Sequence, residues 1–366
     1  MTAPSSRGSI SSRLLPLLQQ LRQVAGEKDR DRINHYILDS LDKLYGIEDG
    51  AIYLYFLHGN QHWLALNATL THRDGEQEIG IIDPYQLNVH ARQELEGLPH
   101  LQTPLQQGQR HLEESPYWQL LVYPLLHHET PYALVELQRA APFSEDELAE
   151  LDQFIGILQD HLNLVRYAET DTLTGMLNRK TFDENLDRVL ASVQETGEEE
   201  ALTAAGSEQR HPPPEPGMIW LSVMDIDHFK QINDRFGHII GDEVLILLAQ
   251  LMRDSFRLHD QLFRFGGEEF VAVIRTGTGE DAHRVLERFH ERVANHEFPL
   301  VGRVTISIGY TLVDPLDTPT ELVARADAAL YHAKHHGRNL VANYEQLLAK
   351  GLIDTGRHQA ADIELF

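Results

Sequence analysis

Cysteine is absent from this chain, and basic residues are few compared with acidic ones. Without cysteine there is no disulfide, no thiol nucleophile, no cysteine-ligated zinc and no thioether attachment of a chromophore. The 31 Lys and Arg residues face 56 Asp and Glu residues, which gives a formal net charge of −25. Nucleic-acid phosphates are held by clustered Lys and Arg, so this charge disfavours nucleic acid as a partner. A nucleotide substrate is still compatible, because a metal ion and a few cations can offset charge locally.

Long apolar runs are missing as well. No stretch approaches the roughly 18 consecutive apolar residues that a membrane-spanning helix needs. The N-terminal segment MTAPSSRGSISSRLLPLL has no long apolar core and no clear cleavage site, so no signal peptide is expected. Together with the absence of cysteine, this favours a cytoplasmic location and an intracellular signal.

The length of 366 residues suggests two domains joined by a helical connector. Residues 10–46 have apolar residues at helical spacing, for example at Leu14, Leu18 and Leu21. Strand-like runs follow, bounded by turn residues, at 51–59, 62–70, 77–85, 118–126 and 131–139. Helices followed by several strands and a further helix predict an α+β domain.

Residues 143–170 are predicted to form one long helix. Its apolar residues alternate spacings of three and four along a heptad seam made of Leu148, Leu151, Ile155, Leu158, Leu162 and Val165. Such a seam either pairs helices between subunits or packs on its own domain, and both readings stay open. The acidic, Pro-, Gly- and Ala-rich segment 194–217 predicts a flexible loop or insertion.

From residue 218 the pattern changes to alternating strands and helices. The run MIWLSVM at 218–224 is typical of a buried central strand. Helical spacing follows over about 231–256, and the strand-like runs QLFRF and FVAVI flank a hairpin at 266–269. A further strand is predicted at 303–312 and a further helix at 320–337.

Acidic residues gather at two points of this region. Asp225 and Asp227 follow the buried strand, and alternate residues on a strand share a face. The hairpin adds Glu268 and Glu269. Carboxylates are the ligands that a hard cation such as Mg²⁺ prefers, and a cation between the two points could polarise a phosphoryl group.

Basic residues could complete such a site. Lys230 lies five residues after Asp225, and Lys334 and Arg338 lie four apart, a spacing that could place them on one helical face. These three cations could neutralise a triphosphate.

Four motifs in the same region together resemble the GGDEF family of diguanylate cyclases. They are DTLTGMLNR at 171–179, DIDHFKQINDRFGHIIGDEVL at 225–245, RFGGEEF at 264–270 and ALYHAKHHGRN at 329–339. The resemblance implies a mainly antiparallel five-stranded sheet flanked by helices, similar to the palm of nucleotide cyclases and polymerases. It also implies that a homodimer, with one GTP per subunit, condenses two GTP into cyclic di-GMP and two pyrophosphates.

The resemblance also assigns roles to individual residues. Asp225, the main-chain carbonyl of Ile226, and Glu268 match the metal positions, with Mg²⁺ as the expected ion and Mn²⁺ as the alternative. Glu268 matches the proton acceptor for the 3′-hydroxyl, with Glu269 beside it. Asn233 and Asp242 match the pair that reads guanine. The phosphate contacts are matched by Lys230, which we also count as catalytic, by Lys334 and Arg338, and by the Phe229 main chain. Gly266 and Gly267 allow the nucleotide to approach closely.

Arg257 and Asp260 form an RxxD string that is separated from Gly266 by five residues. In the family, this string at this distance is the inhibitory site for cyclic di-GMP, and a surface ion pair is the alternative reading. In the entry motif, Asn178 is expected to cap the following helix and Asp171 to pair with Arg179.

The expected organisation is an α+β chain of two domains. Residues 1–145 resemble a GAF domain, an antiparallel sheet with helices, with a PAS domain as the alternative, and the ligand of this sensor stays unassigned. A signalling helix at 146–170, a GGDEF domain at 171–350 and a tail at 351–366 follow. Two alternative functions are a receptor that binds cyclic di-GMP without turnover, and the synthesis of a cyclic mononucleotide from GTP.

Overall fold

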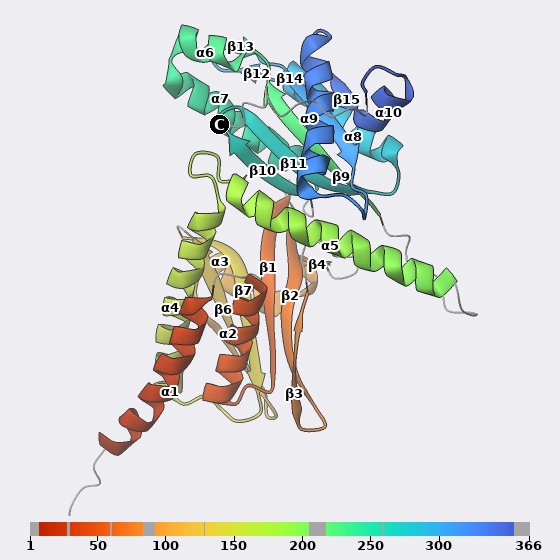
Figure 1. The fold of residues 1–366 in the computed structure, drawn as a ribbon. Coiled ribbons are helices and arrows are strands. Elements are labelled where there is room, and N and C mark those ends of the chain that lie inside the picture. The colour runs from red at the N-terminus through yellow and green to blue at the C-terminus, as the bar shows by residue number, and fades with distance from the viewer. Residues whose placement is uncertain are drawn as a thin grey trace, which may run out of the picture. The chain divides into compact units, whose positions relative to one another are not determined.

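The computed structural model describes residues 7–27, 30–58, 61–82, 92–127, 129–204, 217–257 and 260–354. The chain folds into two compact units, Met1–Ala168 and Glu169–Phe366, which are described separately here (Figure 1). Within the described ranges, no helix is long and apolar enough to cross a membrane.

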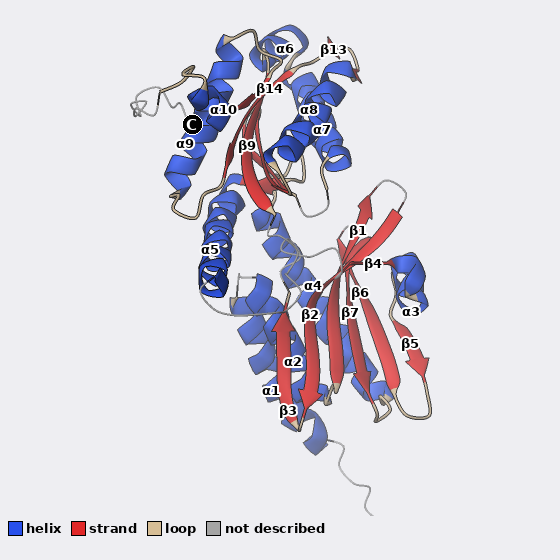
Figure 2. Ribbon diagram, turned by 90° about the vertical axis from the view of Figure 1, so that its right-hand side faces the viewer, coloured by secondary structure: helices blue, strands red, loops and turns tan. Residues whose placement is uncertain are grey.

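The N-terminal unit is a single antiparallel sheet with helices on both faces (Figure 2). The strand order is β3-β2-β1-β7-β6-β5, and β4 pairs with β2. The strands are β1 (Asp49–His58), β2 (Gln61–Arg73), β3 (Glu76–Ile81), β4 (Arg92–Glu94), β5 (His111–Glu114), β6 (Gln119–His127) and β7 (Thr130–Arg139). The helices are α1 (Arg7–Gly26), α2 (Arg30–Tyr45), the short 3-10 helix η2 (Leu95–Gly97), α3 (Pro99–Gln107) and α4 (Glu145–Glu169).

Alternation along the strands explains why both faces are covered. Ala133, Val135 and Leu137 of β7 pack in the core beneath α1, α2 and α4, whereas Leu134 packs in the core beneath α3. The α+β fold predicted for this region is confirmed, and the five predicted strands all occur. The last residues of the run predicted at 77–85 lie outside the described residues, which stop at 82.

The heptad seam of α4 packs on its own unit. Leu151, Ile155 and Leu158 are buried in the core shared with α1 and α2, and the other seam residues pack against the same core. The seam is therefore not available to a second subunit. A different face of α4 exposes Ile157, Leu164 and Tyr167, whose exposed fractions are 47%, 68% and 66%.

The C-terminal unit contains a mixed sheet with the order β15-β14-β9-β11-β10-β8. The four central strands are antiparallel, and β15 and β8 join the edges in parallel. The strands are β8 (Leu177–Asn178), β9 (Met218–Ile226), β10 (Gln261–Gly266), β11 (Glu269–Thr276), β14 (Ile306–Leu312) and β15 (Val341–Asn343). The sheet thus has six described strands, one more than the resemblance implied, and a separate small ribbon pairs β12 (Glu297–Phe298) with β13 (Gly302–Arg303).

Helices cover both faces of this second sheet. They are α5 (Arg179–Ala204), α6 (Phe229–Phe236), α7 (His238–Ser255), α8 (Gly279–Asn295), α9 (Pro319–His335) and α10 (Tyr344–Ala349). Met224 and Ile226 of β9 point to the core under α6, α7 and α8, whereas Leu221 and Val223 point to the core under α5 and α9.

Two local predictions are corrected by this unit. The single helix expected over 231–256 is interrupted at Gly237, whose φ of 86° is a conformation that favours glycine. The loop expected at 194–217 begins later, because residues 194–204 continue α5. Ala and Glu are good helix formers, and the first proline is only at 212. Residues 205–216 lie outside the described residues.

The turn before α5 confirms one expected contact and corrects another. Asn178 caps α5, because its Oδ1 accepts a hydrogen bond from the backbone N–H of Thr181 at 3.0 Å. Asp171 does not pair with Arg179. Its carboxylate instead accepts a hydrogen bond from Arg264 at 3.0 Å, and the Arg179 guanidinium lies over the Phe265 ring.

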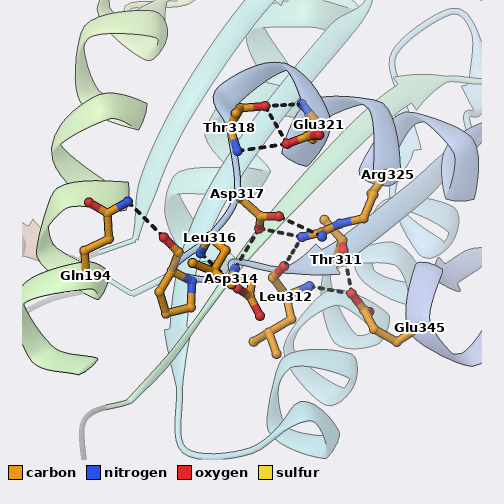
Figure 3. Close-up of polar contacts among 11 residues, drawn as sticks. Gln194, Thr311, Leu312, Asp314, Leu316, Asp317, Thr318, Glu321, Arg325 and Glu345 are labelled. Atoms are coloured by element: carbon orange, nitrogen blue, oxygen red, sulfur yellow. Dashed lines mark hydrogen bonds and ion pairs between the residues drawn. The ribbon is translucent and has the colours of Figure 1, made fainter. Parts of the chain in front are cut away.

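Polar contacts fix the N-terminal end of α9 (Figure 3). Thr318 and Glu321 form a capping box, and Arg325 donates to Asp317 and to the carbonyl of Leu312. Gln194 of α5 donates to the carbonyl of Pro315 in the same loop. These contacts fasten the start of α9 to the end of β14.

Gly309 lets α9 lie close to β14. A Cβ atom at this position would lie 2.1 Å from the backbone N of Leu330 and 2.3 Å from the carbonyl oxygen of Ala326. Neither backbone atom can move without displacing the helix. The position of α9, and with it Lys334 near its C-terminal end, therefore depends on a residue without a side chain.

Candidate functional site

The two acidic segments meet at one end of the central strands. Asp225, at the end of β9, lies directly opposite Glu269, at the start of β11. The backbone N–H of Ile226 also donates to the carbonyl of Glu268 at 3.4 Å. The segments that carry these carboxylates, distant in the sequence, are therefore neighbours.

Lys334 of α9 pairs with one of these carboxylates. Its Nζ lies 2.7 Å from Oδ2 of Asp225, which is buried. Burial raises the pKa of Asp225, the negative charge of Asp227 adds to this, and Lys334 and Arg338 act against it. Burial likewise raises the pKa of Glu268 and of Glu269, and the charge of Asp225 raises both further. Negative charge is thus concentrated here beyond what Lys334 compensates.

This donor set fits a divalent cation with oxygen ligands. Asp225 and Glu268 supply carboxylates, the adjoining Ile226 has a backbone carbonyl, and the mutual repulsion of the carboxylates would be relieved by positive charge. Across the described part of the chain, no group of three or more His, Asp and Glu side chains is arranged to hold a metal. Two carboxylates are still sufficient for Mg²⁺, which commonly keeps waters and binds substrate phosphates.

Asp227 does not join this group, although the sequence suggested a shared face. The strand β9 ends at Ile226, so the alternation of side chains does not continue to residue 227. The Asp227 side chain is buried, and its oxygens accept hydrogen bonds from Ser307, Thr305 and the backbone of Asn339.

The expected guanine-reading residues come from the helix pair α6 and α7. Asn233 is half-buried on α6, and Asp242 is exposed on the first turns of α7. Gly241, the residue before Asp242, lies against Asn233, because a Cβ atom at position 241 would be 1.9 Å from Oδ1 of Asn233. Phe229 is buried at the start of α6, and Lys230 beside it is exposed.

The glycines of the hairpin adopt backbone conformations that disfavour other residues. Gly266 has a φ of 153° and Gly267 a φ of 51°. Arg264 holds this turn, because its guanidinium donates to the carbonyl of Gly267 at 2.8 Å and to Asp171 at 3.0 Å. The hairpin is thereby tied to the entry motif.

Sequence reasoning missed two residues of this neighbourhood. Arg264 was part of a recognised motif, but nothing in the string distinguished it from a surface arginine. Asp327 of α9 is half-buried, its partial burial raises its pKa, and its charge in turn raises the pKa of Glu269. It lies seven residues before Lys334, a spacing that could have placed both on one helical face.

The RxxD pair lies next to β10 and has two different environments. Asp260 is only 7% exposed, and its carboxylate accepts hydrogen bonds from the backbone N–H groups of Arg257 at 2.7 Å and Arg275 at 3.4 Å. The Arg257 side chain is exposed. The aspartate therefore shapes the turn and leaves the arginine at the surface, and residues 258 and 259 between them lie outside the described residues.

Comparison of the chain with known protein families identifies the region that contains this site. Residues 168–340 match the family model described as diguanylate cyclase, GGDEF domain. This region of the chain is a GGDEF domain, as the four motifs predicted.

Individual relatives match about half of the chain. Diguanylate cyclase DgcP of Pseudomonas aeruginosa is 34% identical over 53% of this chain and 27% of its own length. Diguanylate cyclase DgcZ of Escherichia coli is 31% identical over 46% of this chain and 51% of its own length. Response regulator PleD of Caulobacter vibrioides is 38% identical over 48% of this chain and 36% of its own length. The chain thus spans about a quarter to a half of the length of these relatives.

Among solved structures, the GGDEF domain of DgcB from Caulobacter crescentus in complex with c-di-GMP is 33% identical. It covers 49% of this chain and 96% of that chain, with a TM-score of 0.42. The active GGEEF domain of a diguanylate cyclase from Vibrio cholerae is 37% identical, over 35% of this chain and 83% of that chain, with a TM-score of 0.33.

Proposed function

We propose that this protein is a diguanylate cyclase that condenses two GTP into cyclic di-GMP. The observation that carries the proposal is the meeting of Asp225, the Glu268–Glu269 hairpin and Lys334 within a GGDEF domain. The 3′-oxygen of each ribose attacks the α-phosphorus of the other nucleotide, and the bond to pyrophosphate breaks. Two phosphodiester bonds form, two pyrophosphates leave, and each 3′-hydroxyl gives up its proton.

Glu268 is the group we assign to accept that proton. Burial and the charge of Asp225 raise the pKa of this carboxyl, so it is a stronger base than an ordinary glutamate while it is ionised. Glu269 adds negative charge beside it. The turn made by Gly266 and Gly267 has no side chains, which leaves room for the nucleotide beside both carboxylates.

Asn233 and Asp242 are assigned to the guanine base. The carboxylate can accept from N1–H and N2–H, and the amide can donate to a ring acceptor. The Phe229 main chain, Lys230, Lys334 and Arg338 are assigned to the phosphates. Asp225, the Ile226 carbonyl and Glu268 would hold Mg²⁺ or Mn²⁺, which supplies charge neutralisation and phosphoryl polarisation when bound.

The reaction joins two nucleotides, and each chain has ligands for one, so we propose that a homodimer is the active form. Because the heptad seam of α4 is buried, we assign the partner surface to the exposed face with Ile157, Leu164 and Tyr167. These residues are spaced by seven and three, which matches a heptad. The N-terminal unit, expected to be GAF-like, would control this pairing, and Arg257 with Asp260 would bind the product as an inhibitor.

The test is turnover of GTP by the full chain after bound product has been removed. With Mg²⁺ and GTP, chromatography should detect cyclic di-GMP from the wild type and none from Glu268→Gln. The matched control is Glu291→Gln, an exposed glutamate on α8, which should retain wild-type activity. Binding of cyclic di-GMP without turnover would support a receptor instead, and a cyclic mononucleotide product would support the other cyclase chemistry.

A further inference from the structure

Asp227 is a buried carboxylate that the proposed chemistry does not use. It is 5% exposed, and its Oδ1 accepts a hydrogen bond from Ser307 Oγ at 2.7 Å. Its Oδ2 accepts from Thr305 Oγ1 at 2.7 Å and from the backbone N–H of Asn339 at 2.9 Å. Its own N–H donates to the carbonyl of Thr305. One side chain thus joins the end of β9, the start of β14 and the turn after α9.

That turn has an unfavourable backbone conformation. Gly337, Arg338 and Asn339 have φ values of 113°, 59° and 47°. Two consecutive non-glycine residues with positive φ are rare, and such a conformation persists only where neighbouring contacts hold it. The contacts are the N–H of Arg338 to the carbonyl of Ala333 at 3.0 Å and the N–H of Asn339 to Asp227.

The residue at the centre of this turn is Arg338, which is exposed. The peptide group between Arg338 and Asn339 is oriented by the bond to Asp227, so the direction of the Arg338 side chain depends on that bond. The carboxyl group that accepts this bond is itself held in place by Thr305 and Ser307. Asp227 is therefore well suited to hold a strained turn.

We propose that Asp227 is a positioning residue that directs Arg338 toward the substrate phosphates. This inference rests on the proposed function, because it assigns Arg338 to GTP. It adds a role for the second aspartate of the Asp225-Ile226-Asp227 string that is distinct from metal binding.

A double-mutant cycle tests the coupling between the two residues. The dissociation constant for an α,β-methylene analogue of GTP with Mg²⁺ is measured for the wild type, Asp227→Ala, Arg338→Ala and the double variant. We expect Asp227→Ala to weaken binding about tenfold in the wild type, and less than about twofold when Arg338 is already alanine. KM for GTP should rise in parallel, with a smaller effect on kcat.

Two further variants separate positioning from general stability. Ser307→Ala removes one bond to the same carboxylate without touching the turn, and it should leave analogue binding within about twofold of the wild type. Asn339→Gly keeps the backbone donor and relieves the positive φ, so it should restore part of the binding lost in Asp227→Ala. Should Asp227→Ala fail to fold, Asp227→Asn replaces it in the cycle, and the same coupling with a smaller effect is expected.

Independent, multiplicative effects of Asp227 and Arg338 would overturn the inference, and so would the failure of both Asp227 variants to fold. A wild type that binds the analogue but forms no cyclic di-GMP would refute the proposed function, while the binding cycle would still decide the role of Asp227.

Discussion

Gly241→Ala should weaken GTP binding without destabilising the protein. Its Cβ atom would lie 1.9 Å from Oδ1 and 3.0 Å from Cγ of Asn233, well inside the contact distance of about 3.5 Å. The nearest other atom, Cζ of Phe229, is 3.3 Å away, so Asn233 is the group that must move. Its amide is the end of a flexible, half-buried side chain and can turn toward solvent.

The magnitudes follow from what this movement costs. Replacing glycine by alanine within α7 favours the helix by about 0.5–1 kcal/mol. Loss of a hydrogen bond between Asn233 and guanine costs about 0.5–1.5 kcal/mol, and leaving the guanine group unpaired costs about 1–3 kcal/mol. We therefore expect an unfolding free energy that is unchanged or slightly higher, together with a KM for GTP that rises between about threefold and a hundredfold.

The assay combines denaturant unfolding with initial rates of cyclic di-GMP formation. Asn233→Ala is the comparison, and Gly241→Ala should add little to its KM effect in the double variant. An unchanged KM in Gly241→Ala would refute the assignment of Asn233 to guanine. A loss of more than about 2 kcal/mol in stability would show that the backbone, rather than the Asn233 side chain, yields to the added methyl group.

Three further predictions concern stability, pH and assembly. Gly309→Ala should destabilise the protein by about 3 kcal/mol or more in denaturant unfolding, because its methyl group would strike the backbone of α9. Gly156→Ala, within α4 and with open space around it, should instead stabilise the protein by about 0.5–1 kcal/mol. The pKa values of the three site carboxyls, Asp225, Glu268 and Glu269, lie above their ordinary range, so without divalent cations the unfolding free energy should fall as pH rises through and above that range. An unfolding free energy that stays constant across this pH range would contradict the mutual repulsion of these carboxylates. Millimolar Mg²⁺ should reduce the dependence of the unfolding free energy on pH. Leu164→Cys introduces a single thiol into a cysteine-free chain and should give a cross-linked dimer with a bis-maleimide, whereas Glu113→Cys on β5 should not; equal yields would argue against the α4 face.

Local sequence patterns predicted many elements of the fold, because the spacing of apolar residues within a single segment indicates whether it forms a helix or a strand. The strands at 118–126 and 131–139 and the helix at 143–170 appear nearly as expected. The short strand β8 was missed because its edge pairing depends on β10, which is distant in sequence, and β5 was missed because its four residues are too few to show a clear alternation. The extension of α5 through 204 shows helix propensity outweighing an acidic composition.

The site was predictable only where a motif fixes residue type and spacing together. The proximity of Asp225 to the hairpin follows from the pairing of β9 with β11, and the motifs anticipated it. The orientation of Asp227 could not be read from the string, because it depends on where β9 ends and on Thr305 and Ser307, which lie just before and within β14. The same is true of Asp171, whose partner Arg264 lies 93 positions away.

Helix α9 is fastened by Arg325 and Asp317 at one end and presents Lys334 near the other. Because protein contacts hold one end of this helix, a ligand that binds Lys334 near the other end also stabilises the packing of α9 on β14. Nucleotide binding should therefore raise the free energy of unfolding. Saturation with nucleotide at about a hundred times its dissociation constant should then protect the C-terminal unit by about 2.7 kcal/mol. A substitution of Asp317, which removes its contacts at the other end of the helix, should therefore weaken the affinity for a nucleotide that Asp317 does not contact.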